Sequence, residues 1–255
     1  MLPVAISAPD DRAPHEPGIV AVRSSTILLA ADIQQPEPEH GQAMLCGELA
    51  DVQTLLHSLT EAEWYLPTLR AGWTVRDLVL QLISSYESIC RGGRALPARV
   101  LATRVLAGAR QRRQDAVRAA APTRQIMREL SYWGGELTQV IPRSRKASNQ
   151  FRVALPRATW LTRTDIAEAT GRRPLAGPHG GEIVRQAVRD AGGNWSGAPV
   201  LLEITGSAGG RWLAGHGPPT VTMRTDAISF LRLVSGRQAR RVEVSGDTPF
   251  LAIRV

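Results

Sequence analysis

The chain is 255 residues long and strongly basic, with 31 lysine and arginine residues against 23 aspartate and glutamate residues and a formal net charge of +8. This length can bury a large core, in one large domain or two small ones. The sequence contains no apolar run long enough to cross a bilayer and no secretory signal, which excludes an integral membrane protein; we expect a cytoplasmic protein without a membrane partner.

The basic charge does not indicate nucleic-acid binding, and the cysteines do not indicate a metal site. Lys146 is the only lysine, an arginine bias that accompanies abundant Ala, Gly and Val and is typical of a GC-rich genome. The richest basic stretch, residues 91–128, holds ten arginines but no aromatic side chain that would stack on bases, so we expect a solvated helix face and no nucleic-acid partner. Cys46 and Cys90 lack CxxC spacing, which predicts reduced thiols rather than metal ligands.

The first segment of the chain differs in composition from the rest. Residues 1–43 are rich in Pro, Asp, Glu and Gln, which predicts a mobile N-terminal extension. One apolar island, residues 26–33, leaves open the alternative that part of this segment adds a strand or fills a groove.

Residues 44–173 have the periodicity of a helical bundle. Apolar residues from Leu45 to Leu59 recur at spacings of three and four, and further helices are expected from Thr74, within 97–120, over 123–141 and from Pro156. Thr74 and Asp77 fit a capping box, Pro156 suits a first helical position, and Gly171 suits a C-terminal cap. Successive amphipathic helices with modest loops predict an up-and-down four-helix bundle.

Residues 174–255 predict a small α/β domain. A short helix near 180–191 precedes strand patterns in "PVLLEIT", "RWLAG" and "TVTMR", then an amphipathic helix in "TDAISFLRLVSGR" and strand patterns in "RRVEVSG" and "FLAIRV". The glycines of "GPHGGE" and "GSAGG" match no phosphate-binding fingerprint and are interpreted as turns.

Three of these segments carry a resemblance to a known family. "LTEAEWYLPTLRAGWTVRDLVLQL", "TWLTRTDIAEATGR" and "TDAISFLRLVSGR", in this order, resemble the mycothiol-dependent maleylpyruvate isomerase-like proteins of actinobacteria. That family joins a DinB-like four-helix bundle to a domain similar to sterol carrier proteins. The resemblance implies an α+β fold with two domains in this order.

The resemblance also implies a metal site whose ligands have changed here. Family members carry a metal-binding histidine where this chain has Gln81, and an acidic residue and a histidine where it has Ala158 and Thr162. Alanine has no donor atom, and the Gln carbonyl and Thr hydroxyl are neutral, weak ligands for zinc. The five histidines lie outside these helix faces, so we expect no metal and no cofactor.

The remaining polar residues near these positions are the candidate site. Gln81 and Thr162 are expected to orient a substrate by hydrogen bonds, the alternative being that they are tolerated in a collapsed interior. Asp165 is expected to act as a general base, unless it is paired with an arginine and stabilises the fold. Ser85, Trp160, Arg232 and Arg237 are the candidate substrate-binding residues; core packing for Trp160 and solvation for the arginines are the alternatives. Asp77 is assigned to the capping box.

These expectations define the predicted function. We expect a metal-independent enzyme that uses the former metal cleft to isomerise, cyclise or eliminate from a small organic molecule in actinobacterial specialised metabolism. A non-catalytic carrier or sensor, and a mycothiol-dependent transferase that activates its thiol without zinc, are the alternatives.

Overall fold

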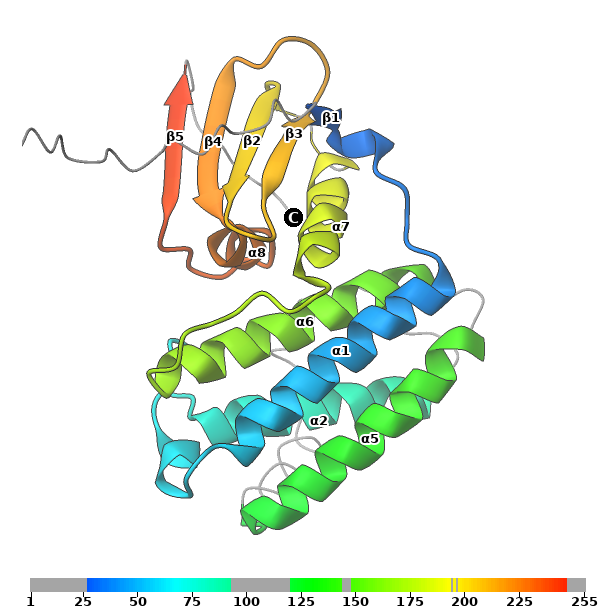
Figure 1. The fold of residues 1–255 in the computed structure, drawn as a ribbon, viewed down its shortest axis with the longest axis vertical. Helices are drawn as coiled ribbons and strands as arrows, with labels where there is room; N and C mark the ends of the chain where they lie inside the picture. Colours follow the sequence, from blue (N-terminus) through cyan, green and yellow to red (C-terminus); the bar gives the residue numbers. More distant parts are fainter. Residues whose placement is uncertain (1–26, 93–119, 144–147, 194, 196, 247–255) are drawn as a thin grey trace, which may run out of the picture.

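The computed structural model describes residues 27–92, 120–143, 148–193, 195 and 197–246. Within them, long helices form a bundle beside a five-stranded mixed sheet that carries two shorter helices (Figure 1). The predicted α+β fold, with the bundle first and the sheet second, is confirmed. No helix in these ranges is long and apolar enough to span a membrane.

The described part of the bundle consists of α1 (Pro38–His57), α2 (Val75–Gly92), α5 (Thr123–Arg143) and α6 (Ser148–Ala169). Its core is built from the apolar faces that the spacing predicts, including Leu45, Leu49, Val52, Val75, Ile83, Leu130 and Leu137, and Ile166 of α6 joins them. The helix expected within 97–120 falls almost entirely outside the described residues.

The structure corrects part of the prediction that residues 1–43 form a mobile extension. Leu28–Leu29 form the short strand β1, which pairs in parallel with β3, and a 3-10 turn follows in which Ala30 is buried. Helix α1 then begins at Pro38, because a proline in the first turn gives up no helical hydrogen bond. The alternative that the apolar island adds a strand is therefore correct; residues 1–26 lie outside the described part.

The predicted helix ends are partly confirmed. At the start of α2, Thr74 N donates to Asp77 Oδ2 (2.8 Å) and Asp77 N donates to Thr74 Oγ1 (3.3 Å), which is the predicted capping box. Gly171 has φ +69°, and Arg172 N donates to Ala167 O (2.7 Å), so α6 ends in the predicted glycine cap.

The predicted start of α6 at Pro156 is wrong, because this proline lies inside the helix. An interior proline removes one helical hydrogen bond and costs about 3 kcal/mol. Val153 and Leu155, on the turn that precedes it, are buried, so tertiary packing compensates for the local penalty.

The sheet has the strand order β1-β3-β2-β4-β5. Its central strands β2 (Val200–Thr205) and β3 (Gly210–Ala214) form the predicted antiparallel hairpin, β4 (Val221–Asp226) lies parallel to β2, and β5 (Val242–Gly246) is antiparallel to β4. Helices α7 (Gly180–Gly193) and α8 (Ala227–Val234) pack on the sheet, where alternate residues of β2 and β4 are buried. The strand expected in "FLAIRV" lies outside the described residues.

Helix α6 joins the two parts of the molecule. It packs against α1 and α2 on the bundle side and against α7 and α8 on the other, as Figure 1 shows. Met44, Trp160 and Leu161 belong to the bundle helices, yet they are buried in one cluster with the sheet and α7. Side chains on the remaining face of α6 therefore meet α8 and the loop that follows it.

Candidate functional site

A tight loop before α2 presents an arginine that the sequence analysis did not select. In this loop Thr68 N donates to Trp73 O (2.8 Å), and Trp73 N donates to Arg70 O (2.9 Å). Thr68 Oγ1 accepts from Arg70 N (3.3 Å), and Gly72 adopts φ +76°, a conformation that a residue with a Cβ rarely adopts. These bonds close the turn, so the position of Arg70 follows from the backbone.

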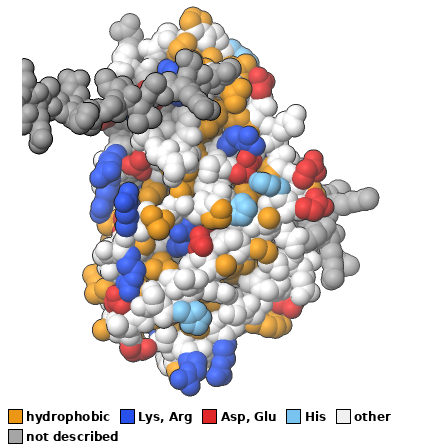
Figure 2. Space-filling view, in the orientation of Figure 1, with side chains coloured by type: hydrophobic (Ala, Val, Ile, Leu, Met, Phe, Trp, Pro, Cys, Tyr) orange, Lys and Arg blue, Asp and Glu red, His pale blue; other side chains and the backbone are white. Residues whose placement is uncertain are grey.

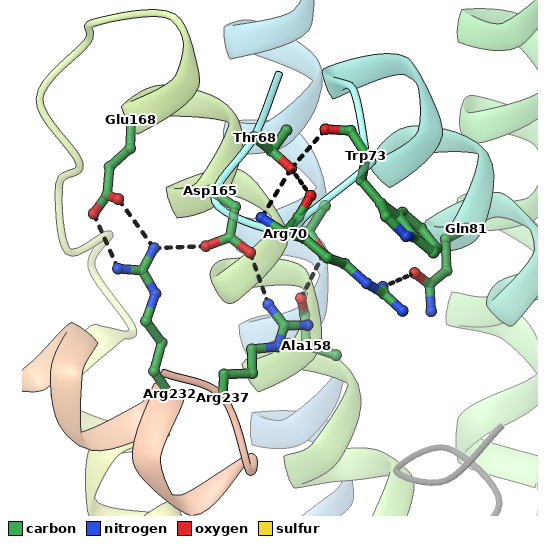
Figure 3. A network of polar contacts seen from close by, with 10 residues as sticks. Thr68, Arg70, Trp73, Gln81, Ala158, Asp165, Glu168, Arg232 and Arg237 are labelled. Carbon is green, nitrogen blue, oxygen red and sulfur yellow. Dashed lines mark hydrogen bonds and ion pairs between the residues drawn. The ribbon is translucent and has the colours of Figure 1, made fainter. Parts of the chain in front are cut away.

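The Arg70 side chain is held on two sides. Its Cζ lies 3.4 Å from the centroid of the Trp73 ring, a stacked cation–π arrangement, and its Nη1 donates to Gln81 Oε1 at 2.5 Å (Figure 3). Desolvation lowers the pKa of Arg70, the positive charge of Arg237 lowers it further, and Asp165 acts in the opposite direction. Arg70 therefore lies within electrostatic reach of both residues.

Asp165 is the centre of an ion-pair network between α6 and the second domain. Its Oδ1 accepts from Arg232 Nη2 (2.6 Å) and its Oδ2 from Arg237 Nη1 (2.7 Å). Arg232 also donates to both carboxylate oxygens of Glu168, at 3.2 and 3.3 Å. Burial opposes the charge on Arg232, but the hydrogen bonds that it donates to Asp165 and Glu168 outweigh this effect and raise the pKa of the guanidinium.

The exposure of these groups differs sharply. The side chains of Arg232 and Asp165 are 4% and 9% exposed, whereas that of Arg237 is 39% exposed. Arg70 and Gln81 are exposed as well. The network thus has a buried side, which holds the domains together, and an open side formed by Arg70, Gln81 and Arg237.

Two predicted residues are hydrogen-bonded within their own helices. Thr162 Oγ1 donates to Ala158 O and Ser85 Oγ donates to Gln81 O, each at 2.9 Å. Ala158, Thr162 and Asp165 follow one another at spacings of four and three, so they lie on one face of α6. Thr162 is buried on the same face as Asp165.

Trp160 points away from this face. It is 1% exposed and packs in the core cluster between α6, α7 and the sheet, with its ring beside Gly180. This is the core packing that the sequence left open as an alternative. The predicted residues that the structure brings together are Gln81, Thr162, Asp165, Arg232 and Arg237.

We call Arg70, Gln81, Thr162, Asp165 and Arg237 the junction site. The sequence did carry one signal for Arg70, which stands three residues before Trp73 in a glycine-containing turn, a spacing that lets a guanidinium fold back onto an aromatic ring. Figure 2, drawn in the orientation of Figure 1, shows basic side chains along the edge of the molecule at which α8 and the end of α6 lie.

The side chains of the junction site do not fit a metal ion. The Gln81 carbonyl oxygen accepts from Arg70, Ala158 has no donor atom, and the Thr162 hydroxyl donates to the backbone. The guanidinium next to Gln81 would also repel a cation. Elsewhere in the described ranges, no three His, Cys, Asp or Glu side chains are grouped as metal ligands.

Comparison with known proteins extends the fold assignment. No protein-family model matches the chain, and no curated protein matches it significantly. The crystal structure of the mycothiol-dependent maleylpyruvate isomerase is similar, with a TM-score of 0.59 and 15% identity over 88% of this chain and 98% of that one. The chain has the fold of this isomerase.

A histidine-to-alanine mutant of the isomerase is also similar, with a TM-score of 0.55, 14% identity and the same coverage. The resemblance seen in three sequence segments is thus confirmed at the level of the fold, including the order of bundle and sheet. Fold alone does not determine chemistry, so function has to be argued from the junction site.

Proposed function

We propose that the protein is a metal-independent enzyme, diverged from the maleylpyruvate isomerase-like fold, that acts on a small organic molecule at the junction site. The observation that supports this is the replacement of metal-ligand positions by a preorganised polar group: Gln81 holds Arg70 at the place where the family resemblance implies a metal-binding histidine. The exposed side chains of Arg70, Gln81 and Arg237 offer polar groups that a small polar substrate can reach from solution.

The residues of the site have chemically distinct roles in this proposal. The stacked guanidinium of Arg70 is a fixed positive charge that would stabilise negative charge developing on a substrate oxygen during isomerisation, cyclisation or elimination. Gln81 holds this guanidinium and has an amide N–H₂ left to orient the substrate. Asp165 positions Arg237, because both of its oxygens already accept from arginines. A place in actinobacterial specialised metabolism is part of the same proposal.

A second candidate function is a non-catalytic carrier or sensor. The observation that favours it is also at Asp165: both of its carboxylate oxygens accept from arginines, so its hydrogen bonds serve the contact between the two domains. In this case the junction site binds its ligand without turning it over.

The test is a thermal-shift screen of small organic molecules and mycothiol, followed by mass spectrometry of each stabilising compound after incubation, with and without EDTA. A ligand of the native state raises the melting temperature. Turnover that EDTA leaves unchanged, and that Arg70→Gln or Gln81→Ala reduces, supports the proposal. Binding without turnover supports the carrier or sensor, mycothiol-dependent group transfer supports the transferase, and stoichiometric metal in the untagged protein overturns metal independence.

A further inference from the structure

We propose that the open edge of strand β5 is an interface at which two copies of this chain pair, antiparallel and about a twofold axis, to form one continuous sheet. The partner that this edge fits is a second copy, because the charges on and beside β5 complement one another. Such an interface concerns the assembly of the protein and lies outside the proposed function of the junction site.

Strand β5 ends the sheet with an uncovered edge. In the order β1-β3-β2-β4-β5 it pairs with β4, and no other strand within the described residues pairs with it (Figure 1). All five of its residues are exposed. The N–H and C=O groups along the edge of a sheet are a template on which another strand can pair.

Two apolar side chains of β5 are left without cover. Val242 and Val244 are the register partners of Thr225 and Met223 in β4, which are 4% and 1% exposed on the side of the sheet where the helices pack. Helix α8 packs on β2 and β4, whereas Val242 and Val244, one strand further out, are 36% and 49% exposed. A further strand at this edge would place side chains directly beside both valines.

The backbone of β5 directs its free groups to the same edge. The Arg241 carbonyl oxygen accepts from Thr225 Oγ1 at 2.6 Å, so the backbone of Arg241 faces β4. Successive residues of an antiparallel strand alternate in the direction of their N–H and C=O groups. The groups of Val242 and Val244 therefore point away from β4, and pairing through them breaks no hydrogen bond of the described sheet.

The face of the sheet opposite the helices has a row of alternating charges that ends at β5. Arg211, Glu203, Arg224 and Glu243 are register partners on the successive strands β3, β2, β4 and β5, and Arg211 Nη2 pairs with Glu203 Oε1 at 2.9 Å. Arg241 stands two residues before Glu243, so its side chain projects to the same face. A positive charge from a second copy would continue the row beyond Glu243.

These charges select one register for the pair. When the twofold axis passes Val242, Arg241 of each copy lies opposite Glu243 of the other, and two complementary pairs form. An axis at Glu243 places two carboxylates opposite each other, and an axis at Val244 gives Glu243 no arginine. Opposite charges stabilise a cross-strand pair and like charges destabilise it, so the first register is favoured. In that register Val244 lies opposite Arg240, whose aliphatic stem can cover it.

The experiment is analytical ultracentrifugation of the full chain at about 1 to 100 μM, a range that spans a micromolar dissociation constant. We expect dimerisation that is about tenfold weaker in Arg241→Glu and in Glu243→Arg, because each substitution places like charges opposite one another at two symmetrical positions. An equimolar mixture of the two single variants should dimerise as the wild type does, since an acidic strand then meets a basic one. Arg128→Glu, at an exposed position of α5, is the matched control with the same change of charge and should dimerise normally.

Four results would overturn the proposed interface: a monomer at every concentration, equal dimerisation of the wild type and both single variants, an equal loss in Arg128→Glu, or a mixture that dimerises no better than its components. Amide hydrogen exchange tests the strand pairing itself, since the amides of Val242 and Val244 should be better protected at high than at low protein concentration. Protection independent of concentration would also overturn it, because the edge would then pair within one chain. The melting temperature of each variant shows that it is folded.

Discussion

Arg237, in the loop after α8, donates a 2.7 Å hydrogen bond to Asp165 of α6, whose other carboxylate oxygen accepts from the buried Arg232. One carboxylate therefore joins the helical bundle to the sheet domain and also orients an arginine of the junction site. In the proposed function the same side chain contributes to stability and to ligand binding, and the two contributions can be separated by measurement.

Asp165→Asn is predicted to destabilise the protein by about 1.5–3 kcal/mol, because it removes one charged partner of the buried Arg232 while Glu168 remains as the other. Urea unfolding at neutral pH measures the change. Glu203→Gln is the matched control, since Glu203 pairs with Arg211 across two strands near the surface, where a pair contributes about 0–1 kcal/mol. Equal destabilisation by the two substitutions would show that the ion pairs of Asp165 contribute no more to stability than a surface pair does.

The capping box and the glycine cap could be predicted from sequence because their partners lie within a few residues. Thr74 and Asp77 satisfy each other locally, and Gly171 adopts its positive φ whatever packs on the helix. Pro156 is the counterexample: local preference places a helix start there, but burial of the preceding turn decides the outcome.

The partners of the site residues could be predicted only in part. The spacing of Thr162 and Asp165 predicts a shared helix face, and the sequence left open that Asp165 pairs with an arginine. Which arginine it pairs with depends on a contact between residues 72 positions apart, and periodicity contains no information about such a contact. The same holds for Arg70, because its hydrogen-bond partner Gln81 lies on the helix that follows its loop.

Glu48 is predicted to make stability depend on pH near neutrality. It is 1% exposed, and burial raises its pKa to about 7, although Arg163 donates to it at 3.1 and 3.4 Å and opposes the rise. A pKa raised in the folded state means a contribution that is complete below the unfolded pKa and is lost as the pH rises through about 7. Stability should therefore decline between about pH 4.5 and 7.5, by at most about 3 kcal/mol.

Urea unfolding of wild type and Glu48→Gln between pH 4.5 and 8 measures this decline. The variant has no carboxyl group to titrate at this position, so its stability should change less over the interval. The quantity compared is the change in the free energy of unfolding with pH, not its absolute value. Arg163 retains Asp51 as a partner in the variant. Parallel curves would mean that Glu48 is already ionised in the native protein at pH 5.

Glu63 is predicted to act in the opposite direction. Its hydrogen bonds to Arg172 and to Thr60 lower its pKa to about 2. A lowered pKa contributes stability above the unfolded value, and that contribution is lost as the pH falls toward 2. Glu63→Gln should be less stable than the wild type at pH 7, and the difference should shrink as the pH falls from about 4 toward 2. Thermal unfolding across this range tests it; a constant difference would contradict the assignment.

Trp73 is predicted to act on ligand binding through Arg70. Trp73→Leu removes the ring on which the guanidinium stacks, whereas Trp73→Phe retains an aromatic face. A stacked cation–π contact contributes about 0.5–1 kcal/mol at exposed sites, so Trp73→Leu should weaken binding of a compound found by the thermal-shift screen about threefold, with Trp73→Phe close to the wild type. Both substitutions also lose packing, since Trp73 borders the bundle core, and the melting temperature of each free protein measures that loss separately. If the affinity for that compound follows the melting temperature in both variants rather than the presence of an aromatic ring, Trp73 is a packing residue and Arg70 does not depend on it for its orientation.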